Sequence, residues 1–196
     1  MLGVIAGKMP KPDIDAAYHG LAGKSVGVMV WVDPSTLIDW PGLPLDLANS
    51  LDAKLKEAQA AKQKELEGTT FPYQPRSFVR YQKEHPGINA LPIIDVAPKL
   101  DVARLVYVEV NSFSSRADGA VAMYLGQMDA SIKVIEVENG VAKLGYSESG
   151  IRIQYPRSAP REGQLNQTDR AMYAGSINEM STELAIIFFR HPDLSP

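Results

Sequence analysis

The sequence predicts an α/β (α+β) domain with a mixed, mainly antiparallel sheet, an antiparallel meander and helices packed on one face. Three observations support this class: a valine-rich run at Lys24–Val32, three consecutive strand-like runs between residues 105 and 153, and two amphipathic helical patterns at Leu45–Glu67 and Thr168–Arg190. Each pattern has an apolar face that must be buried against another element, so a layered sheet-and-helix domain follows.

The length of 196 residues favours one domain. Residues 1–23 include Pro10, Pro12, Gly20 and Gly23, which interrupt regular structure, and few large apolar side chains. We therefore divide the chain into an N-terminal arm or linker, residues 1–23, and a single α/β domain, residues 24–196.

Composition argues against several classes of protein. A net charge of −3 leaves no basic excess for neutralising phosphates, which argues against nucleic-acid binding. No apolar run reaches the roughly 18 residues of a membrane span, and Met1–Gly7 is too short for a signal peptide. Cysteine is absent, which removes disulfides, thiolate catalysis and cysteine metal sites but leaves the compartment open.

The first strand is expected at Lys24–Val32. Alternate positions are valine, and Gly27, Met29 and Trp31 lie between them, so both faces are apolar. This pattern is typical of a central strand that is covered on both sides. Three prolines then predict a loop at Asp33–Pro44, followed by the helix Leu45–Glu67, with Gly68 as its C-terminal stop.

The remaining elements follow in order. Arg76–Glu84 is expected to be a short helix, and Ile88–Leu100 fits either a strand or a helical turn. The meander comes next, and Asn139-Gly140 predicts a two-residue hairpin between Ala130–Glu138 and Val141–Ser149. The register that this turn implies pairs Glu136 with Lys143, Ile135 with Leu144, and Lys133 with Tyr146.

No catalytic or cofactor motif stands out. Gly23-Lys24-Ser25 precedes a strand and lacks the earlier glycine of a phosphate-binding loop, so we interpret it as a turn. The three histidines have no ligand-like spacing, and we expect no metal and no cofactor. One carboxylate set stays open as a hydrolase site, since acidic residues near strand and loop ends can gather in space. This set consists of Asp33, Asp39, Asp95 and Asp101.

The predicted loop 33–44 is unusually apolar for a connection. Leu37, Ile38, Trp40 and Leu43 are costly to leave in water. Two interpretations stay open: these residues fold back as a lid over the end of the sheet, or they form a partner-binding surface with Trp40 as its anchor.

The order of elements resembles the soluble domain of bacterial envelope lipoproteins related to LpoB, CsgG and the N-terminal domain of TolB. The resemblance covers about residues 24–190 and is carried by the strand Lys24–Val30, by Leu100–Val108 and by Met128–Gly140. Two departures are the long segment Gly68–Leu91 and the lipid-bearing cysteine, which this chain does not contain.

The resemblance implies a non-catalytic module that acts through contacts with other envelope proteins, or with itself as a homo-oligomer. It also implies a location on the periplasmic side of the bacterial envelope, with the membrane reached only through an N-terminal lipid anchor. The alternatives are a carboxylate-based hydrolase and a cytosolic small-ligand-binding regulatory domain.

Overall fold

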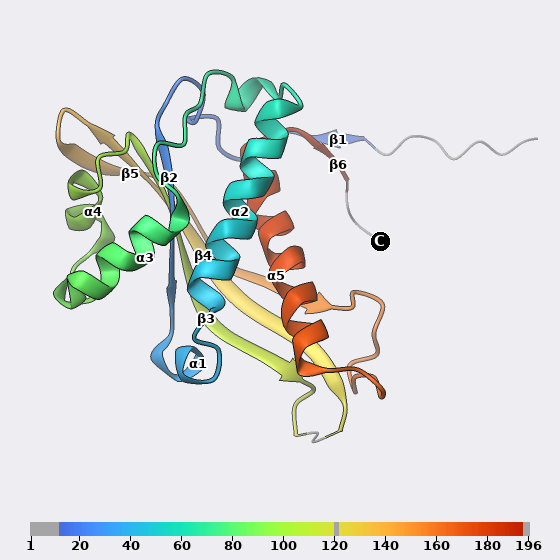
Figure 1. The fold of residues 1–196 in the computed structure, drawn as a ribbon. Helices are drawn as coiled ribbons and strands as arrows, with labels where there is room; N and C mark the ends of the chain where they lie inside the picture. Colours follow the sequence, from blue (N-terminus) through green and yellow to red (C-terminus); the bar gives the residue numbers. More distant parts are fainter. Residues whose placement is uncertain (1–11, 120–121, 194–196) are drawn as a thin grey trace, which may run out of the picture.

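A four-stranded sheet forms the centre of the computed structural model, which describes residues 12–119 and 122–193 (Figure 1). Its order is β2-β3-β4-β5, with β2 and β3 parallel and the other neighbours antiparallel. The strands are β2 Val26–Val32, β3 Arg104–Arg116, β4 Tyr124–Glu138 and β5 Val141–Tyr155. The predicted mixed, mainly antiparallel sheet with its meander is therefore confirmed. The Met1–Gly7 segment lies outside the described residues.

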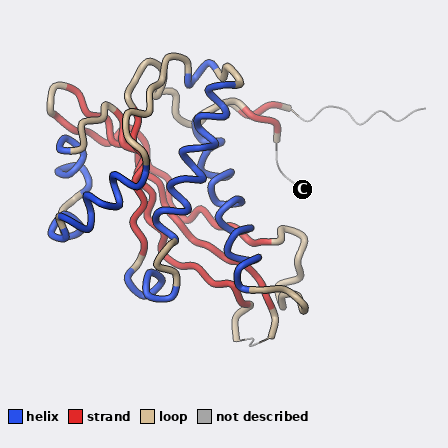
Figure 2. Tube along the Cα trace, viewed as in Figure 1, coloured by secondary structure: helices blue, strands red, loops and turns tan. Residues whose placement is uncertain are grey.

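Helices cover both faces of this sheet. The α-helices are α1 Pro34–Asp39, α2 Leu43–Ala60, α3 Pro75–Glu84, α4 Ile93–Val96 and α5 Asp169–Ala185. Single 3₁₀ turns lie at Lys64–Leu66, Pro86–Ala90, Ala97–Lys99 and Ile186–Phe188. The long helices α2 and α5 run side by side along one face, as predicted, and α3 and α4 lie beside the opposite face (Figures 1 and 2).

The alternation of β2 divides its side chains between two cores. Val28 and Val30 pack under α2 and α5, and Met29 packs with Phe78 of α3 on the other face. Coverage on both sides is thus confirmed, but the predicted central position is wrong, because β2 is an edge strand. Alternating apolar side chains show that both faces of a strand are covered. They do not show whether its backbone is hydrogen-bonded to a strand on one side or on both sides.

The hairpin was predicted correctly at its turn and in its first pairs. Asn139 and Gly140 both have positive φ, 53° and 77°, and Lys143 Nζ lies 3.1 Å from Glu136 Oε2. The predicted pair Lys133–Tyr146 is wrong, because a bulge shifts Tyr146 opposite Val134.

The bulge has a packing reason at Gly145. A Cβ there would lie 2.6 Å from Cγ of Glu136, so the bulge places a residue without a side chain against that carboxylate.

The segment 33–44 is partly helical, which corrects the predicted loop. Asp33 caps α1 by accepting a hydrogen bond from Ser35 N at 2.9 Å, and a second hydrogen bond, from the Ser35 hydroxyl, contributes most to lowering the pKa of Asp33. Pro34 occupies the first turn, where a missing N–H costs nothing. The prolines therefore mark a helix start rather than a loop.

Helix α2 begins two residues before the predicted start and ends at Ala60 rather than at Glu67. Lys62 adopts φ 60° and donates to Gln59 O, and Gln63 N donates to Ala58 O. These two hydrogen bonds form a Schellman motif, with Lys62 in the position that glycine usually takes. The helix therefore ends before Gly68, the predicted C-terminal stop.

The other helical predictions are close to the structure. Helix α3 differs from its prediction by one residue, and the ambiguous segment Ile88–Leu100 forms helical turns. Thr168 caps α5 as predicted, accepting a hydrogen bond from Ala171 N at 3.1 Å. The end of α5 lies earlier than Arg190, because the chain tightens into a 3₁₀ turn that buries Phe188.

A buried arginine joins the N-terminal segment to the sheet. Arg104 is 4% exposed, and its Nε donates to Gly20 O at 3.0 Å. Its Nη2 lies 3.2 Å from Glu138 Oε1 and 3.8 Å from Glu136 Oε2. The Tyr18 hydroxyl donates to Glu136 at 2.8 Å, and this hydrogen bond contributes most to lowering the pKa of the carboxyl.

Part of the predicted arm therefore packs with the domain. Tyr18 and Leu21 are buried in the core under α2 and α5. Near the two ends of the described chain, the short strands β1 Asp13–Ile14 and β6 His191–Pro192 pair antiparallel. The boundary between an arm and a domain at residue 24 stays a prediction.

Ser176 is a buried polar group without a partner among the described residues. Its Oγ lies between α5 and Gly126 of β4, so close that a Cβ on Gly126 would be 2.1 Å from the Ser176 Oγ. We expect Ser176→Ala to raise the free energy of unfolding by about 1 kcal/mol, because the desolvation cost of the hydroxyl disappears. Thermal unfolding checks this.

The matched control for this substitution is Ser181→Ala on the same helix. Ser181 is equally buried, but its Oγ contacts Ser50 Oγ at 2.8 Å and Asn178 O at 3.0 Å, so its loss should destabilise the protein. Equal losses for both variants would show that Ser176 has a partner after all.

Candidate contact surfaces

Helix α1 presents two of the four predicted contact residues to solvent. Ile38 is 81% exposed, the highest value among the large apolar residues of the described chain, and Leu37 is 38% exposed. Both stand on the same short helix, at the end of the sheet where β2 finishes (Figure 1). Exposing an isoleucine instead of burying it costs roughly 1.5–3 kcal/mol.

Trp40 holds this helix against the body of the domain. Its ring stacks on Tyr173 of α5 at 5.1 Å between centroids and meets Phe113 of β3 edge-on at 4.9 Å. The Tyr173 hydroxyl donates to Asp46 at 2.7 Å, and burial raises the pKa of Tyr173. Trp40 is half-buried in this aromatic cluster, so α1 has a rigid base.

The four predicted residues are therefore divided between two roles. Leu43 is completely buried in the core under α2, where it cannot meet a partner. Trp40 faces mostly inward, as the lid interpretation expects, whereas Leu37 and Ile38 face outward. The exposed apolar side chains of this segment, Leu37 and Ile38, form a surface that we call the α1 knob.

A second apolar surface lies on the opposite face of the sheet. It is a groove of about 380 Å³ whose floor comes from β2, β3 and β4, and whose two sides are β5 and the chain before and within α4. We call it the α4 groove. Its lining residues are Trp31, Asn89, Leu91, Pro92, Ile93, Ile94, Tyr107, Glu109, Lys133, Ile135 and Leu144.

The rim of the α4 groove is apolar and its floor is partly polar. Leu91, Ile94 and Leu144 are exposed. On the floor, Lys133 Nζ binds Glu109 Oε2 at 2.6 Å, and burial raises the pKa of Tyr107 beside them. Reasoning from the sequence missed this groove. The available signal was the run of apolar residues between Pro92 and Val96, which has no periodicity of its own.

The strand β5 forms one rim of the groove and lies at the edge of the sheet opposite β2. None of its residues is buried, and Val141 is 69% exposed. Two register shifts against β4 interrupt it, near Gly145 and Gly150. Bulges of this kind protect an edge against pairing with a further strand, so the apolar groove is the better contact surface on this side.

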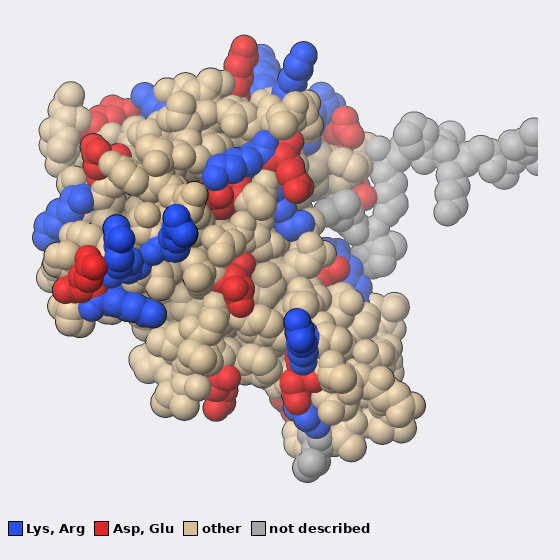
Figure 3. Space-filling model, viewed as in Figure 1, with Lys and Arg blue, Asp and Glu red and all other residues tan. Residues whose placement is uncertain are grey.

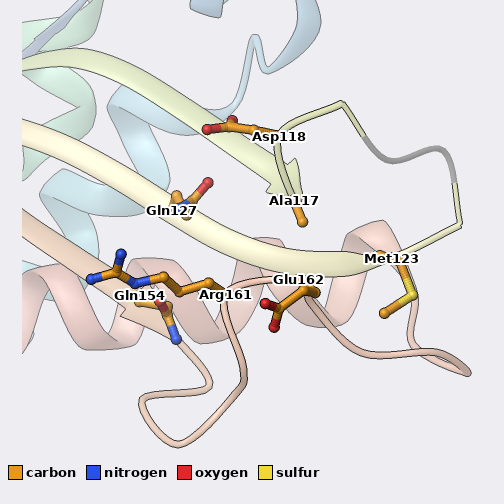
Figure 4. Close-up of a pocket in the computed structure, with 7 residues that line it drawn as sticks. All are labelled: Ala117, Asp118, Met123, Gln127, Gln154, Arg161 and Glu162. Carbon is orange, nitrogen blue, oxygen red and sulfur yellow. The ribbon is translucent and has the colours of Figure 1, made fainter.

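A polar pocket of about 640 Å³, larger than the α4 groove, lies where β3 ends and β4 begins (Figure 4). It contains Asp118 and Glu162, the carboxylates that a hydrolase would need. Figure 4 shows the two side chains coming from different loops, with their carboxylates not directed at one another.

Two of the four carboxylates that the sequence suggested, Asp33 and Asp101, lie at opposite ends of the sheet. Asp33 follows the last residue of β2, whereas Asp101 precedes β3, whose Arg104 pairs with Val26 at the start of β2. About six residues of strand, roughly 20 Å, separate the two ends. Asp33 caps α1, and Asp101 accepts a hydrogen bond from Tyr73 at 2.8 Å.

The described residues contain no cluster of His, Asp or Glu that would hold a metal ion. Among these same residues, every helix is too short or too polar to cross a bilayer.

Charge is distributed unevenly around the two apolar surfaces. The α1 segment carries Asp33 and Asp39 and no basic residue. Helix α3, which leads into the wall of the α4 groove, exposes Arg76, Arg80 and Lys83 against one acidic residue. Figure 3 shows Lys and Arg gathered over α3.

No protein-family model matches the chain, and the search of curated proteins finds no match. The chain is structurally similar to lipoprotein GNA1162 from Neisseria meningitidis, with 14% identity, a TM-score of 0.46, and coverage of 82% of this chain and 97% of that chain.

It is also similar to PelC from Paraburkholderia phytofirmans, solved as a dodecamer, with 8% identity, a TM-score of 0.47, and coverage of 92% and 97%. A third similar structure is the hypothetical protein CT253 from Chlamydia trachomatis, with 11% identity, a TM-score of 0.42, and coverage of 83% and 98%. The solved structures that resemble this chain thus include a lipoprotein and PelC, while the finer resemblance to LpoB, CsgG and TolB stays a prediction.

Proposed function

We propose that this chain is a non-catalytic domain of a bacterial envelope lipoprotein and that it acts by binding other proteins on the periplasmic side. The observation that supports the binding role most strongly is the α1 knob. A six-residue helix holds Ile38 almost fully in water, and Trp40 fixes that helix to the core. Rigidly presented apolar side chains lose little conformational freedom on binding, which makes them good interface anchors.

The envelope location is part of the same proposal. It is supported by the order of elements that resembles the LpoB, CsgG and TolB group, and it requires a lipid anchor upstream of the domain. The proposal carries no catalytic residue, cofactor or metal.

The test of the binding role is Ile38→Asp. Because Ile38 is exposed and contacts no core cluster, we expect the free energy of unfolding to stay within about 0.5 kcal/mol of the wild type. We expect binding to envelope proteins to weaken at least about tenfold, measured by co-purification of the lipid-anchored full chain from detergent extracts.

The matched control is Leu165→Asp. Leu165 is 61% exposed, lies in the loop between β5 and α5, and belongs neither to the α1 knob nor to the lining of the α4 groove. If both substitutions leave the captured proteins unchanged, the α1 knob is not the contact surface. If both remove them equally, the effect is non-specific.

A further inference from the structure

We infer that the partner of the α1 knob is the α4 groove of a second copy of this chain, so that copies associate head to tail. This inference deepens the proposed function by naming the partner. It rests on a complementary pair of surfaces within one chain: an apolar projection and an apolar groove, neither of which is filled by residues 12–119 or 122–193 of the same chain.

The knob does not occupy the groove of its own chain. Ile38 is 81% exposed and is absent from the groove lining, although Trp31 on the groove floor precedes α1 by only a few residues. The two surfaces share no residue. A copy that offers its knob to one neighbour therefore keeps its groove free for another.

The chemistry of the two surfaces matches. The groove provides an apolar rim of Leu91, Ile94 and Leu144, which suits the Leu37 and Ile38 side chains. The knob is flanked by Asp33 and Asp39, whereas the wall of the groove continues from the basic helix α3; on the floor, Lys133 is neutralised by its ion pair with Glu109, so the positive charge at the groove comes from α3. Charges of opposite sign would thus face each other across the contact and fix its orientation.

The geometry of the assembly follows from the difference between the two surfaces. An interface that joins unlike patches is heterologous, so it produces a closed ring if the rotation between copies closes, and a filament if it does not. A self-pairing of β5 edges would instead stop at a dimer. The two arrangements are therefore distinguishable by stoichiometry.

The experiment uses the full chain in three preparations: wild type, Ile38→Asp and Leu144→Asp. Sedimentation velocity over a concentration series should show oligomers larger than dimers for the wild type. Each variant alone should associate at least about tenfold more weakly, because each retains only one functional half of the interface. An equimolar mixture of the two variants should form dimers and no larger species, since the intact knob of one fits the intact groove of the other.

The matched control is Val141→Asp. Val141 lies on the same strand as Leu144 and is 69% exposed, against 54% for Leu144, but it does not line the groove. It should leave the assembly unchanged. Ile94→Asp replaces Leu144→Asp if the latter unfolds, because Ile94 lies on the opposite wall of the groove.

Three results would overturn the inference: a wild-type chain that stays monomeric at every concentration, a mixture of variants that forms no dimer, or an equal loss of assembly in Val141→Asp. The proposed function is judged separately. If the wild type is monomeric while Ile38→Asp still loses its envelope partners, the binding role stands and only the identity of the partner is wrong.

Discussion

Replacing Arg104 by methionine should lower the free energy of unfolding by about 3–5 kcal/mol, which is the range expected when one member of a buried ion pair is removed. Arg104 is 4% exposed and binds Gly20 O, Ala103 O and Glu138. Its loss leaves Glu136 with less compensation in a mostly buried position. For a chain of this size, the melting temperature should fall by roughly 10 °C.

Two further variants separate this mechanism from a general packing defect. Lys24→Met removes an exposed cation 4.0 Å from Glu138, and it should cost under about 0.5 kcal/mol. The double variant Arg104→Met with Glu136→Gln should lose less than the sum of the single changes, because the uncompensated carboxylate is gone. Strict additivity in urea unfolding would argue against the ion pair as the cause.

Replacing Trp40 by alanine should lower the free energy of unfolding by about 3 kcal/mol, near the lower end of the range for aromatic truncations because Trp40 is only half-buried. The substitution removes both the stack on Tyr173 and the edge contact with Phe113. It should also weaken protein binding, since α1 loses the base that orients Leu37 and Ile38. Equilibrium unfolding followed by circular dichroism checks the stability effect.

Trp40→Phe and Ile38→Ala are the controls for this result. Phenylalanine preserves part of the aromatic cluster, so the loss should be near 1 kcal/mol. Ile38→Ala should leave stability unchanged, because that side chain is exposed. A Trp40→Ala variant as stable as the wild type would mean that the cluster does not hold α1 and that the lid interpretation is wrong.

The sequence alone was sufficient to predict the features that depend on residues close together in the chain. Asn139-Gly140 determines a hairpin because both residues tolerate positive φ, and the observed angles agree. Thr168 caps α5 with a side chain three residues from its donor. The alternation in β2 correctly indicated burial of both faces, since that information is carried by the side chains themselves.

The sequence also located the exposed apolar surface, although only two of the four residues that it suggested belong to it. It singled out an apolar segment around Trp40, and Leu37 and Ile38 are indeed exposed there. It did not separate these two from Leu43, which α2 draws into the core. The difference depends on how α1 and α2 pack on the sheet, and no local pattern encodes that packing.

The features that only the tertiary structure decided all depend on contacts between distant segments. The bulge at Gly145 accommodates Glu136, which Tyr18 and Arg104 hold in place. The position of β2 at the sheet edge depends on backbone pairing, which side chains do not report. The α4 groove joins Trp31, the chain around Ile94, and Leu144, so it exists only after the four strands have assembled. Local sequence determines which way a residue faces within its own element, whereas an edge, a bulge or a groove is set by the free energy of packing elements that lie far apart in the chain.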